Sequence, residues 1–321
     1  MARVLHRMLG AGLAAGLAGC ASPPPSPMAA PDTARPTESP VFEETRSAVR
    51  STAEWLARGV DGWFGDQPFE DGGKVTDGRL SVGLLHREDD GTSVNLRFNA
   101  RFRLPNLEKS AYLFVGRDNP RDVVTDKQDT LTRQQRLLPK GADDRRFIAG
   151  FGLSPTDALG FRVGFRGGLK PYAQLRYSKP WDLSERNRLE FRQTLFWTVD
   201  DHVGATAALS YEHALSPTLA ARWLNALTIT QVVKKAEWSS GLGVFKAMGE
   251  QRLLTLEALA NGRQGSGVGV IDYGLQTRWE QPLGRDWLLG ELVIGHFWPR
   301  PDPLLPRSRA WAVGTTLKLK F

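Results

Sequence analysis

The sequence predicts an all-β protein: an antiparallel transmembrane β-barrel of about fourteen strands, preceded by one amphipathic helix. The first observation is alternation. From Trp311 to Phe321 every second residue is apolar or β-branched, and the residues between them are small or charged. A period of two places these two sets on opposite faces of a strand. The second observation is that this pattern recurs from Arg79 onward, broken by turn residues about every twelve to twenty positions.

The third observation is the low hydropathy of the chain. Its mean hydropathy is −0.33, and no long apolar run follows residue 20. Helical membrane spans need about 20 consecutive apolar residues, so they are excluded. A membrane barrel is not excluded, because its strands spread their apolar residues over every second position.

Residues 1–19 are expected to form a lipoprotein-type signal peptide. Two arginines precede a short run of Leu, Ala, Gly and Met, which is too short for a permanent span but typical of a signal peptide. The run closes with Leu17-Ala18-Gly19-Cys20, which resembles the lipobox of bacterial lipoproteins. This resemblance implies that the Cys20 thiol is lipidated and that Cys20 becomes the mature N-terminus. The alternative is an ordinary cleaved signal peptide.

Two short regions separate the signal peptide from the strands. Residues 20–40 form a tether rich in Pro, Ser and Ala, which lacks apolar side chains to pack. Residues 41–66 form one amphipathic helix, because apolar residues recur there at helical spacing with charged residues between them. We expect this helix to cap or plug the periplasmic end of the barrel; the alternative is a helix lying at the membrane interface. Residues 67–321 then form the barrel.

The strand pattern is clearest from Val94 to Leu104, where five Asn or Arg residues alternate with six apolar ones. The number of such runs is even, as single-chain bacterial barrels require. Twelve strands is the alternative, because Pro171 interrupts one run and the third run alternates poorly. The fourteen runs lie near 79–87, 93–104, 110–117, 145–153, 158–167, 169–178, 187–199, 202–212, 218–231, 236–247, 250–261, 268–280, 285–298 and 308–321.

The connections between these runs also alternate in length. Counted back from Phe321, the longest connection, Asp118–Asp144, falls on the side opposite the termini, where long loops belong. We interpret it as a solvated loop; the alternative is a constriction loop folded into the pore. The short connections fall on the side of the termini: Leu104–Ser110, Ser154–Asp157, Leu215–Thr218, Met248–Gln251 and Gln281–Arg285.

A series of alternating strands that ends on an aromatic residue resembles the outer-membrane β-barrel proteins of Gram-negative bacteria. The resemblance covers roughly residues 79–321. It implies a location in the outer membrane, with the lipid-anchored N-terminus on the periplasmic side. It also implies that lipid, lipopolysaccharide and the barrel-assembly machinery are partners, and that Phe321 is the assembly signal.

If the apolar faces contact lipid, the opposite faces line a lumen that is rich in cations. Fewer acids share these faces, and fixed positive charge favours the entry of anions. Because Arg binds carboxylate and phosphate bidentately, we expect a passage for anionic solutes or acidic polysaccharide. The alternative is a closed structural or assembly barrel whose arginines pair with scattered acids. The predicted lumen cations are Arg97, Arg101, Arg103, Arg162, Arg166, Lys170, Arg176, Arg188, Arg192, Arg222, Arg278 and Lys318.

The sequence predicts neither a catalytic residue nor a cofactor. An outer-membrane lipid hydrolase remains a second alternative, because His202 and Ser210 lie on one predicted strand. About eight strand residues separate them, however, which is beyond hydrogen-bond reach. Cys20 is the only cysteine, and the acids of 118–144 lack the spacing of a calcium loop, so no metal is expected. The net charge of +7 is spread along the chain, so no nucleic acid is expected as a partner.

Overall fold

The computed structural model describes Ser47 and residues 74–321, except 104–109, 119, 127–145, 250, 266–268, 301 and 303. The predicted signal peptide, the lipidation site Cys20 and the tether lie outside the described residues. So does the predicted helix 41–66, apart from Ser47.

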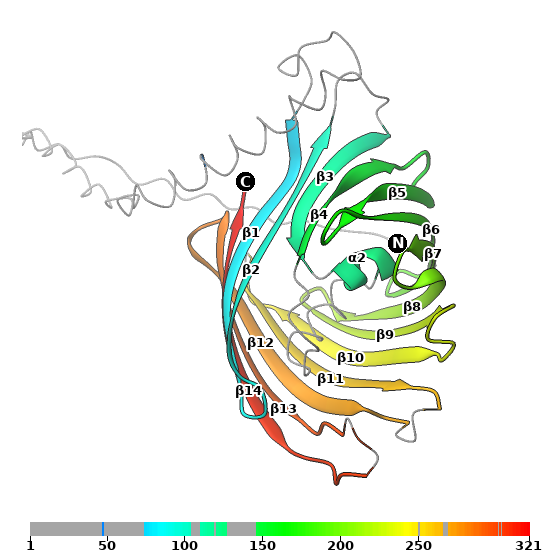
Figure 1. Cartoon of the computed structure of the whole chain (residues 1–321). Coiled ribbons are helices and arrows are strands. Elements are labelled where there is room, and N and C mark those ends of the chain that lie inside the picture. Colours follow the sequence, from blue (N-terminus) through cyan, green and yellow to red (C-terminus); the bar gives the residue numbers. More distant parts are fainter. Residues whose placement is uncertain are drawn as a thin grey trace, which may run out of the picture. The chain divides into compact units, whose positions relative to one another are not determined.

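Fourteen antiparallel strands form a closed barrel (Figure 1). Each strand pairs with its neighbours in sequence, and β1 pairs with β14 to close the sheet. The prediction of fourteen strands is confirmed, and the alternative of twelve is wrong. The strands are β1 (Lys74–Arg87), β2 (Gly91–Arg103), β3 (Ala111–Asp118), β4 (Arg146–Leu153), β5 (Leu159–Arg166), β6 (Lys170–Ser184), β7 (Asn187–Thr198), β8 (His202–Ser216), β9 (Leu219–Thr230), β10 (Glu237–Ala247), β11 (Leu253–Arg263), β12 (Asp272–Arg285), β13 (Leu288–Phe297) and β14 (Ala310–Lys320).

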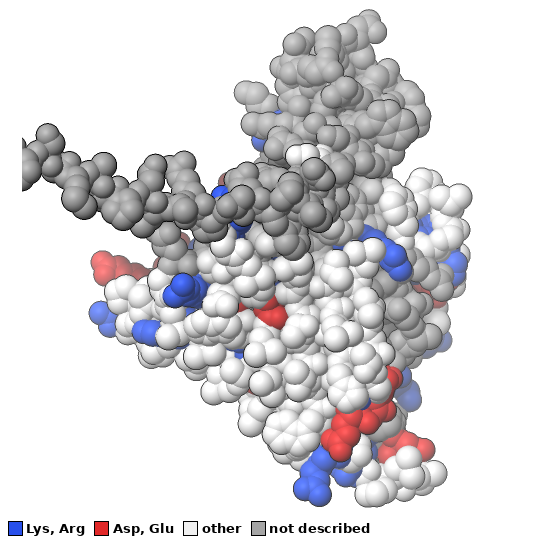
Figure 2. Space-filling view, turned by 90° about the vertical axis from the view of Figure 1, so that its left-hand side faces the viewer, with Lys and Arg blue, Asp and Glu red and all other residues white. Residues whose placement is uncertain are grey.

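Because apolar and polar residues alternate in the sequence, the outer face of the barrel wall is apolar and the inner face is polar. On β2, Val94 and Leu96 are exposed outward, whereas Asn95 between them is buried inward. The same division holds on β14, where Trp311 and Val313 are exposed. In Figure 2 the middle of one side of the wall is largely uncharged, and charged side chains gather toward its rims. An outer apolar band between polar rims is the surface that a lipid bilayer requires of a barrel.

Several strands extend further than their sequence pattern predicts, among them β1, which begins at Lys74, and β8, which ends at Ser216. β6 continues to Ser184 and β12 to Arg285, although each contains a proline. In β12 the pairing with β13 shifts register between Pro282 and Arg285. A proline lacks an N–H donor and is tolerated where the ladder is interrupted by such an irregularity. The predicted connection 281–285 is therefore wrong, because these residues belong to β12.

The seam between β1 and β14 is a regular antiparallel pair. It runs from Arg79 opposite Lys320 to Arg87 opposite Ala312. The backbone N–H of Phe321 extends this pairing by donating a hydrogen bond to the carbonyl oxygen of Gly78 at 3.0 Å. A closed seam leaves no unpaired strand edge, which a barrel in lipid cannot tolerate.

A short helix, α2 (Pro120–Thr125), follows β3 and lies inside the barrel against β4, β6 and β7 (Figure 1). Val124 is 1% exposed and packs among inward-facing side chains of these walls. The sequence pattern does not predict this helix, which lies in the connection 118–144 that we interpret from the sequence as a solvated loop. A helix of six residues is too short to show a helical period, although Pro120 at its first position is a favoured start. In the part of the chain that is described, no helix is long and apolar enough to cross a membrane.

Candidate functional site

The inner face of the wall carries the cations that the sequence assigns to the lumen. Buried threonines of β7, β8 and β9 lie on the same face, so the wall is polar where it is not charged. The contacts of each cation decide which of them could act on a solute. The structure groups them as Arg162, Arg176 and Arg192; Arg166 and Lys170; Arg97, Arg278 and Lys318; and, apart from these groups, Arg101, Arg103, Arg188 and Arg222.

Three arginines on the consecutive strands β5, β6 and β7 form the first group. Arg162 and Arg192 both act electrostatically on Arg176, which places the three guanidinium groups in one neighbourhood. Two unit charges 4 Å apart repel by about 4 kcal/mol at an effective dielectric constant of 20. Such a cluster therefore requires anions close by. We call it the arginine cluster.

One such anion is Asp126, the residue that directly follows α2. Its Oδ2 lies 3.4 Å from Nη1 of Arg192 and accepts a hydrogen bond from the Thr194 hydroxyl at 3.3 Å. Its Oδ1 lies 3.7 Å from Nη1 of Arg176. Asp126 has a φ of 53°, a left-handed conformation that Asp adopts more readily than most residues. The end of α2 thus turns a carboxylate toward the arginine cluster.

The position of α2 is fixed by contacts that do not involve Asp126. The amide of Gln174 donates hydrogen bonds to the carbonyl oxygens of Val123 at 3.1 Å and Val124 at 2.8 Å. The Val124 side chain fills an apolar cluster that Phe114 and Tyr172 help to form. Helix α2 is therefore held by hydrogen bonds to its last turn and by apolar packing.

Arg162 has no acidic partner in the described part of the chain. Its Nε donates a hydrogen bond to the hydroxyl of Tyr112 at 2.9 Å, and its guanidinium lies 5.8 Å from the ring centroid of Phe114. The hydroxyl of Tyr172 is also buried, with no hydrogen-bond partner among the described residues. One guanidinium and one hydroxyl at this place thus keep capacity to bind an anion.

Glu190 is the second carboxylate of the arginine cluster. It accepts hydrogen bonds from the Ser178 hydroxyl at 2.9 Å and from Arg192 at 3.3 Å. Among the described residues, three guanidinium groups therefore face two carboxylates, Asp126 and Glu190, which leaves one positive charge in excess.

The second group lies beside the connection between β7 and β8. Asp200 accepts from Nζ of Lys170 at 2.7 Å and from Nη2 of Arg166 at 3.1 Å. Asp201 lies 3.7 Å from the same Arg166 nitrogen. Two cations face two carboxylates here, so this group is neutral.

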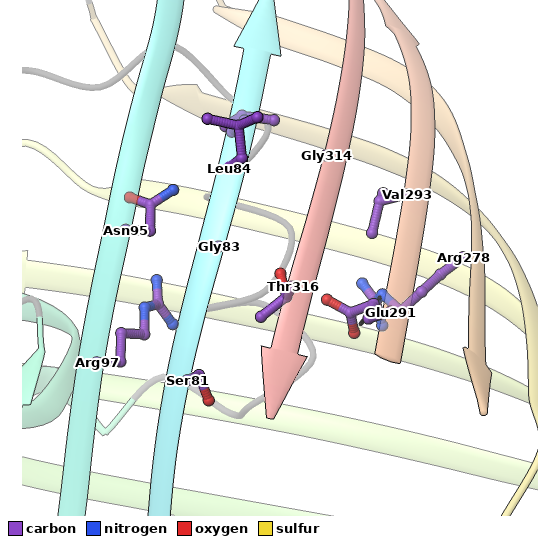
Figure 3. A pocket seen from close by; sticks show the side chains of 11 residues that line it. Ser81, Gly83, Leu84, Asn95, Arg97, Arg278, Glu291, Val293, Gly314 and Thr316 are labelled. Carbon is purple, nitrogen blue, oxygen red and sulfur yellow. Dashed lines mark ion pairs between the residues drawn. The ribbon is translucent and has the colours of Figure 1, made fainter. Parts of the chain in front are cut away.

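The third group lines β12, β13 and β14. The Arg278 guanidinium lies 3.2 Å from Glu257 and 3.6 Å from Glu291, and all three side chains are 3% exposed. Lys318 pairs with Glu291 at 2.6 Å and with Glu280. Figure 3 shows Arg278 and Glu291 together on one side of a recess, with Arg97 of β2 on its other side. The cations and carboxylates of this wall compensate one another.

The remaining four cations have surroundings that differ from one another. Arg101 lies over an aromatic ring of β3, 5.5 Å from its centroid. Arg222 pairs with Glu212 at 2.5 Å. Arg103 and Arg188 are exposed.

The residues of the hydrolase alternative are not assembled into a catalytic arrangement. His202 and Ser210 face the lumen on β8, and no hydrogen bond links their side chains. The His213 ring contacts the Asn187 amide oxygen at 2.7 Å, and His296 lies between Trp298 and Trp311. Within the described ranges, no three His, Cys, Asp or Glu side chains could share a metal ion.

Sequence reasoning missed Asp126, Tyr112 and Tyr172 as parts of the cluster. Asp126 stands in the connection that the sequence suggests is solvated; Tyr112 belongs to the run that alternates poorly, and Tyr172 to the run that Pro171 interrupts. The signal that could have found Asp126 is the Val123-Val124 pair just before it, because two apolar residues in a charged loop indicate that the segment packs against something.

The comparisons with known proteins return only distant structural likenesses. No protein-family model matches the chain, and no curated protein sequence matches it. The outer membrane channel DcaP of Acinetobacter baumannii is 8% identical, with 78% of this chain and 98% of that chain covered and a TM-score of 0.48. An anion-selective porin from Comamonas acidovorans is 8% identical, with 78% and 100% covered and a TM-score of 0.45. The KdgM porin is 7% identical, with 76% and 99% covered and a TM-score of 0.35. The strand pairing, and not these likenesses, establishes the barrel.

Proposed function

We propose that the chain is an outer-membrane β-barrel lipoprotein that passes anionic solutes through its lumen. A closed barrel with an apolar outer band and a polar, charged interior supports this proposal. Such a wall isolates an aqueous interior from lipid, and fixed charges on the inner face select among the solutes that enter.

The observation that carries the proposal is the charge excess of the arginine cluster. Counted over the residues that the structure describes, Arg162, Arg176 and Arg192 face two carboxylates, whereas Arg166 and Lys170 face two between them. The excess lies next to α2, the one described segment inside the barrel, where the passage is narrowed. Positive charge at a narrowing lowers the barrier for anions and raises it for cations.

The anchor and the partners complete the proposal. Cys20 would carry the lipid that attaches the N-terminus to the periplasmic face of the outer membrane, and Phe321 would be read by the barrel-assembly machinery. The outer apolar band would contact lipid and lipopolysaccharide. The solutes would be small acids or acidic polysaccharide, because guanidinium groups bind carboxylates in bidentate geometry.

Planar-bilayer recording tests this function. We expect the wild type to conduct and its reversal potential in a salt gradient to report a preference for anions. Replacing Arg162, Arg176 and Arg192 together with Gln should move the reversal potential toward cations. Arg103→Gln and Arg188→Gln are the controls, since each removes one positive charge from an exposed position. A cation-selective wild type would overturn the proposal.

A non-conducting structural barrel is the second candidate. One observation favours it: Glu257, Arg278 and Glu291 form a network that is 3% exposed, so part of the inner wall is packed rather than wetted. A bilayer that stays silent with folded, heat-modifiable protein would decide for this candidate.

A further inference from the structure

The carboxylate of Asp126 is held by longer contacts than the carboxylate of Asp200. Its contacts with Arg192, Arg176 and Thr194 measure 3.4, 3.7 and 3.3 Å. Charge-assisted hydrogen bonds between N and O are usually about 2.7–2.9 Å long. The pair Lys170–Asp200 has this length at 2.7 Å. Asp126 is therefore held by long contacts in a cluster where the described guanidinium groups outnumber the carboxylates.

The groups around Asp126 also keep unused binding capacity. Arg162 has no carboxylate partner within the described residues, and the Tyr172 hydroxyl, on a side chain 2% exposed, makes no hydrogen bond to any of them. An incoming anion would find the remaining N–H groups of Arg162, whose Nε is bound to Tyr112, and the Tyr172 hydroxyl beside the two guanidinium groups that Asp126 contacts. Buried polar groups without partners are costly, so a ligand that satisfies them gains affinity.

The backbone beside Asp126 is anchored without its carboxylate. Gln174 binds the carbonyl oxygens of Val123 and Val124, and the Val124 side chain is 1% exposed in its apolar cluster. The Asp126 side chain can therefore leave the arginines while α2 stays in place. Exchange of one carboxylate for another then requires only a change of side-chain rotamer.

We propose that Asp126 is a built-in competitor: it occupies the arginine cluster in the absence of solute, and an acidic solute binds there by displacing its carboxylate. This inference rests on the proposed function and adds its regulation. The class of ligand is a compound with carboxylate groups, which match the guanidinium groups as Asp126 does. The competitor lowers the affinity for such solutes, so that a bound acid is released again and can move through the passage.

The test compares two variants that remove the same charge from the same cluster. Citrate is titrated into the full-length protein in detergent micelles, and binding is measured by isothermal titration calorimetry. Asp126→Asn removes the competitor, whereas Glu190→Gln removes a carboxylate of the cluster that is hydrogen-bonded to Ser178 and Arg192. A site that its competitor fills nine-tenths of the time loses about tenfold in affinity, so Asp126→Asn should tighten binding about tenfold. Removal of a negative charge alone, which Glu190→Gln measures, should tighten citrate binding by about two- to threefold.

Three outcomes would overturn the inference. Equal tightening in the two variants means that charge, and not competition, sets the affinity. Weaker binding in Asp126→Asn means that the carboxylate orients the arginines for the ligand. Absence of citrate binding in the wild type and in Asp126→Asn, with both heat-modifiable on a gel, means that the cluster is no anion site. Because binding in micelles does not require conduction, failure here is distinguishable from a silent or cation-selective bilayer, which concerns the proposed function.

Discussion

The rings of Phe321 and Phe98 stack across the barrel seam, with their centroids 6.2 Å apart and their planes inclined by 12°. Phe321 is the last residue of the chain, Phe98 lies on β2, and between them β1 contributes Gly78. A Cβ at residue 78 would overlap the Phe321 ring, so only glycine leaves room for the stack. The Phe321 ring thus connects the end of β14 with β2, although β14 itself pairs with β1.

We expect Phe321→Ala to lower the yield and stability of the folded barrel. The stack contributes about 0.5–1.5 kcal/mol beyond the area that the ring buries, and its loss weakens the last pairing of the seam. Phe321→Trp is the control, because it keeps an aromatic ring. The measurement is the fraction of protein that migrates as the heat-modifiable form, together with its unfolding midpoint in urea.

Gly78→Ala should act on the same contact from its other side. The added methyl group displaces the Phe321 ring, so the variant should lose about as much stability as Phe321→Ala. In the double variant the two losses should not add, because they concern one interaction. Full additivity in urea unfolding would show that the stack contributes nothing to the seam.

The regular part of this fold was predictable from the sequence, because alternation in strands is a local property. Each of the fourteen runs predicted from alternation corresponds to one strand, and the largest differences are at the start of β1 and at the proline-containing ends of β6 and β12. Alternation also separates the two faces of each strand, so inward positions such as Arg162 and Arg192 follow from the sequence directly.

The composition of the arginine cluster was not predictable in the same way. The place of α2 depends on long-range contacts, chiefly Gln174 with Val123 and Val124, about fifty residues apart. A six-residue helix carries no period that would reveal its packed side. The partner of each arginine depends on strand register as well as on face, and register between neighbouring strands cannot be read from either strand alone.

Removal of the Gln174 amide should release α2 from the wall. Gln174→Leu leaves two buried carbonyl oxygens without donors, which costs about 1–3 kcal/mol for each group that stays unsatisfied. We expect larger current fluctuations in single-channel recordings, because the segment inside the passage is held less firmly. Gln193→Leu, on the opposite face of β7, is the control and should leave the recordings unchanged. Quiet traces from both variants would show that packing of Val124 alone holds α2.

The buried network of β11, β12 and β13 should be the most sensitive to loss of a single charge. Glu257 contacts Arg278 at 3.2 Å and accepts from the Gln276 amide at 2.6 Å, all with little exposure. Removing one member of a buried ion pair typically costs about 3–5 kcal/mol, because the other charge is left uncompensated. Glu257→Leu should therefore lower the free energy of unfolding by this order. The double variant Glu257→Leu/Arg278→Met should recover much of the loss, and a double variant as unstable as the single one would contradict this explanation.

Asp200→Asn should increase anion preference by an amount that depends strongly on salt. Asp200 neutralises Lys170 at 2.7 Å and Arg166 at 3.1 Å, and its own side chain is 49% exposed. A half-exposed pair of this kind is worth only about 0–1 kcal/mol, so the expected shift in reversal potential is small. Screening shortens to about 3 Å near 1 M salt, whereas it is about 10 Å at 0.1 M. The shift should therefore be measurable at 0.1 M KCl and vanish at 1 M KCl.

Asp182→Asn is the matched control, because Asp182 lies 4.0 Å from the exposed Arg188 and is 79% exposed. A shift of equal size in the control, or one that persists at 1 M KCl, would mean that the carboxylate acts through structure and not through its field on passing ions.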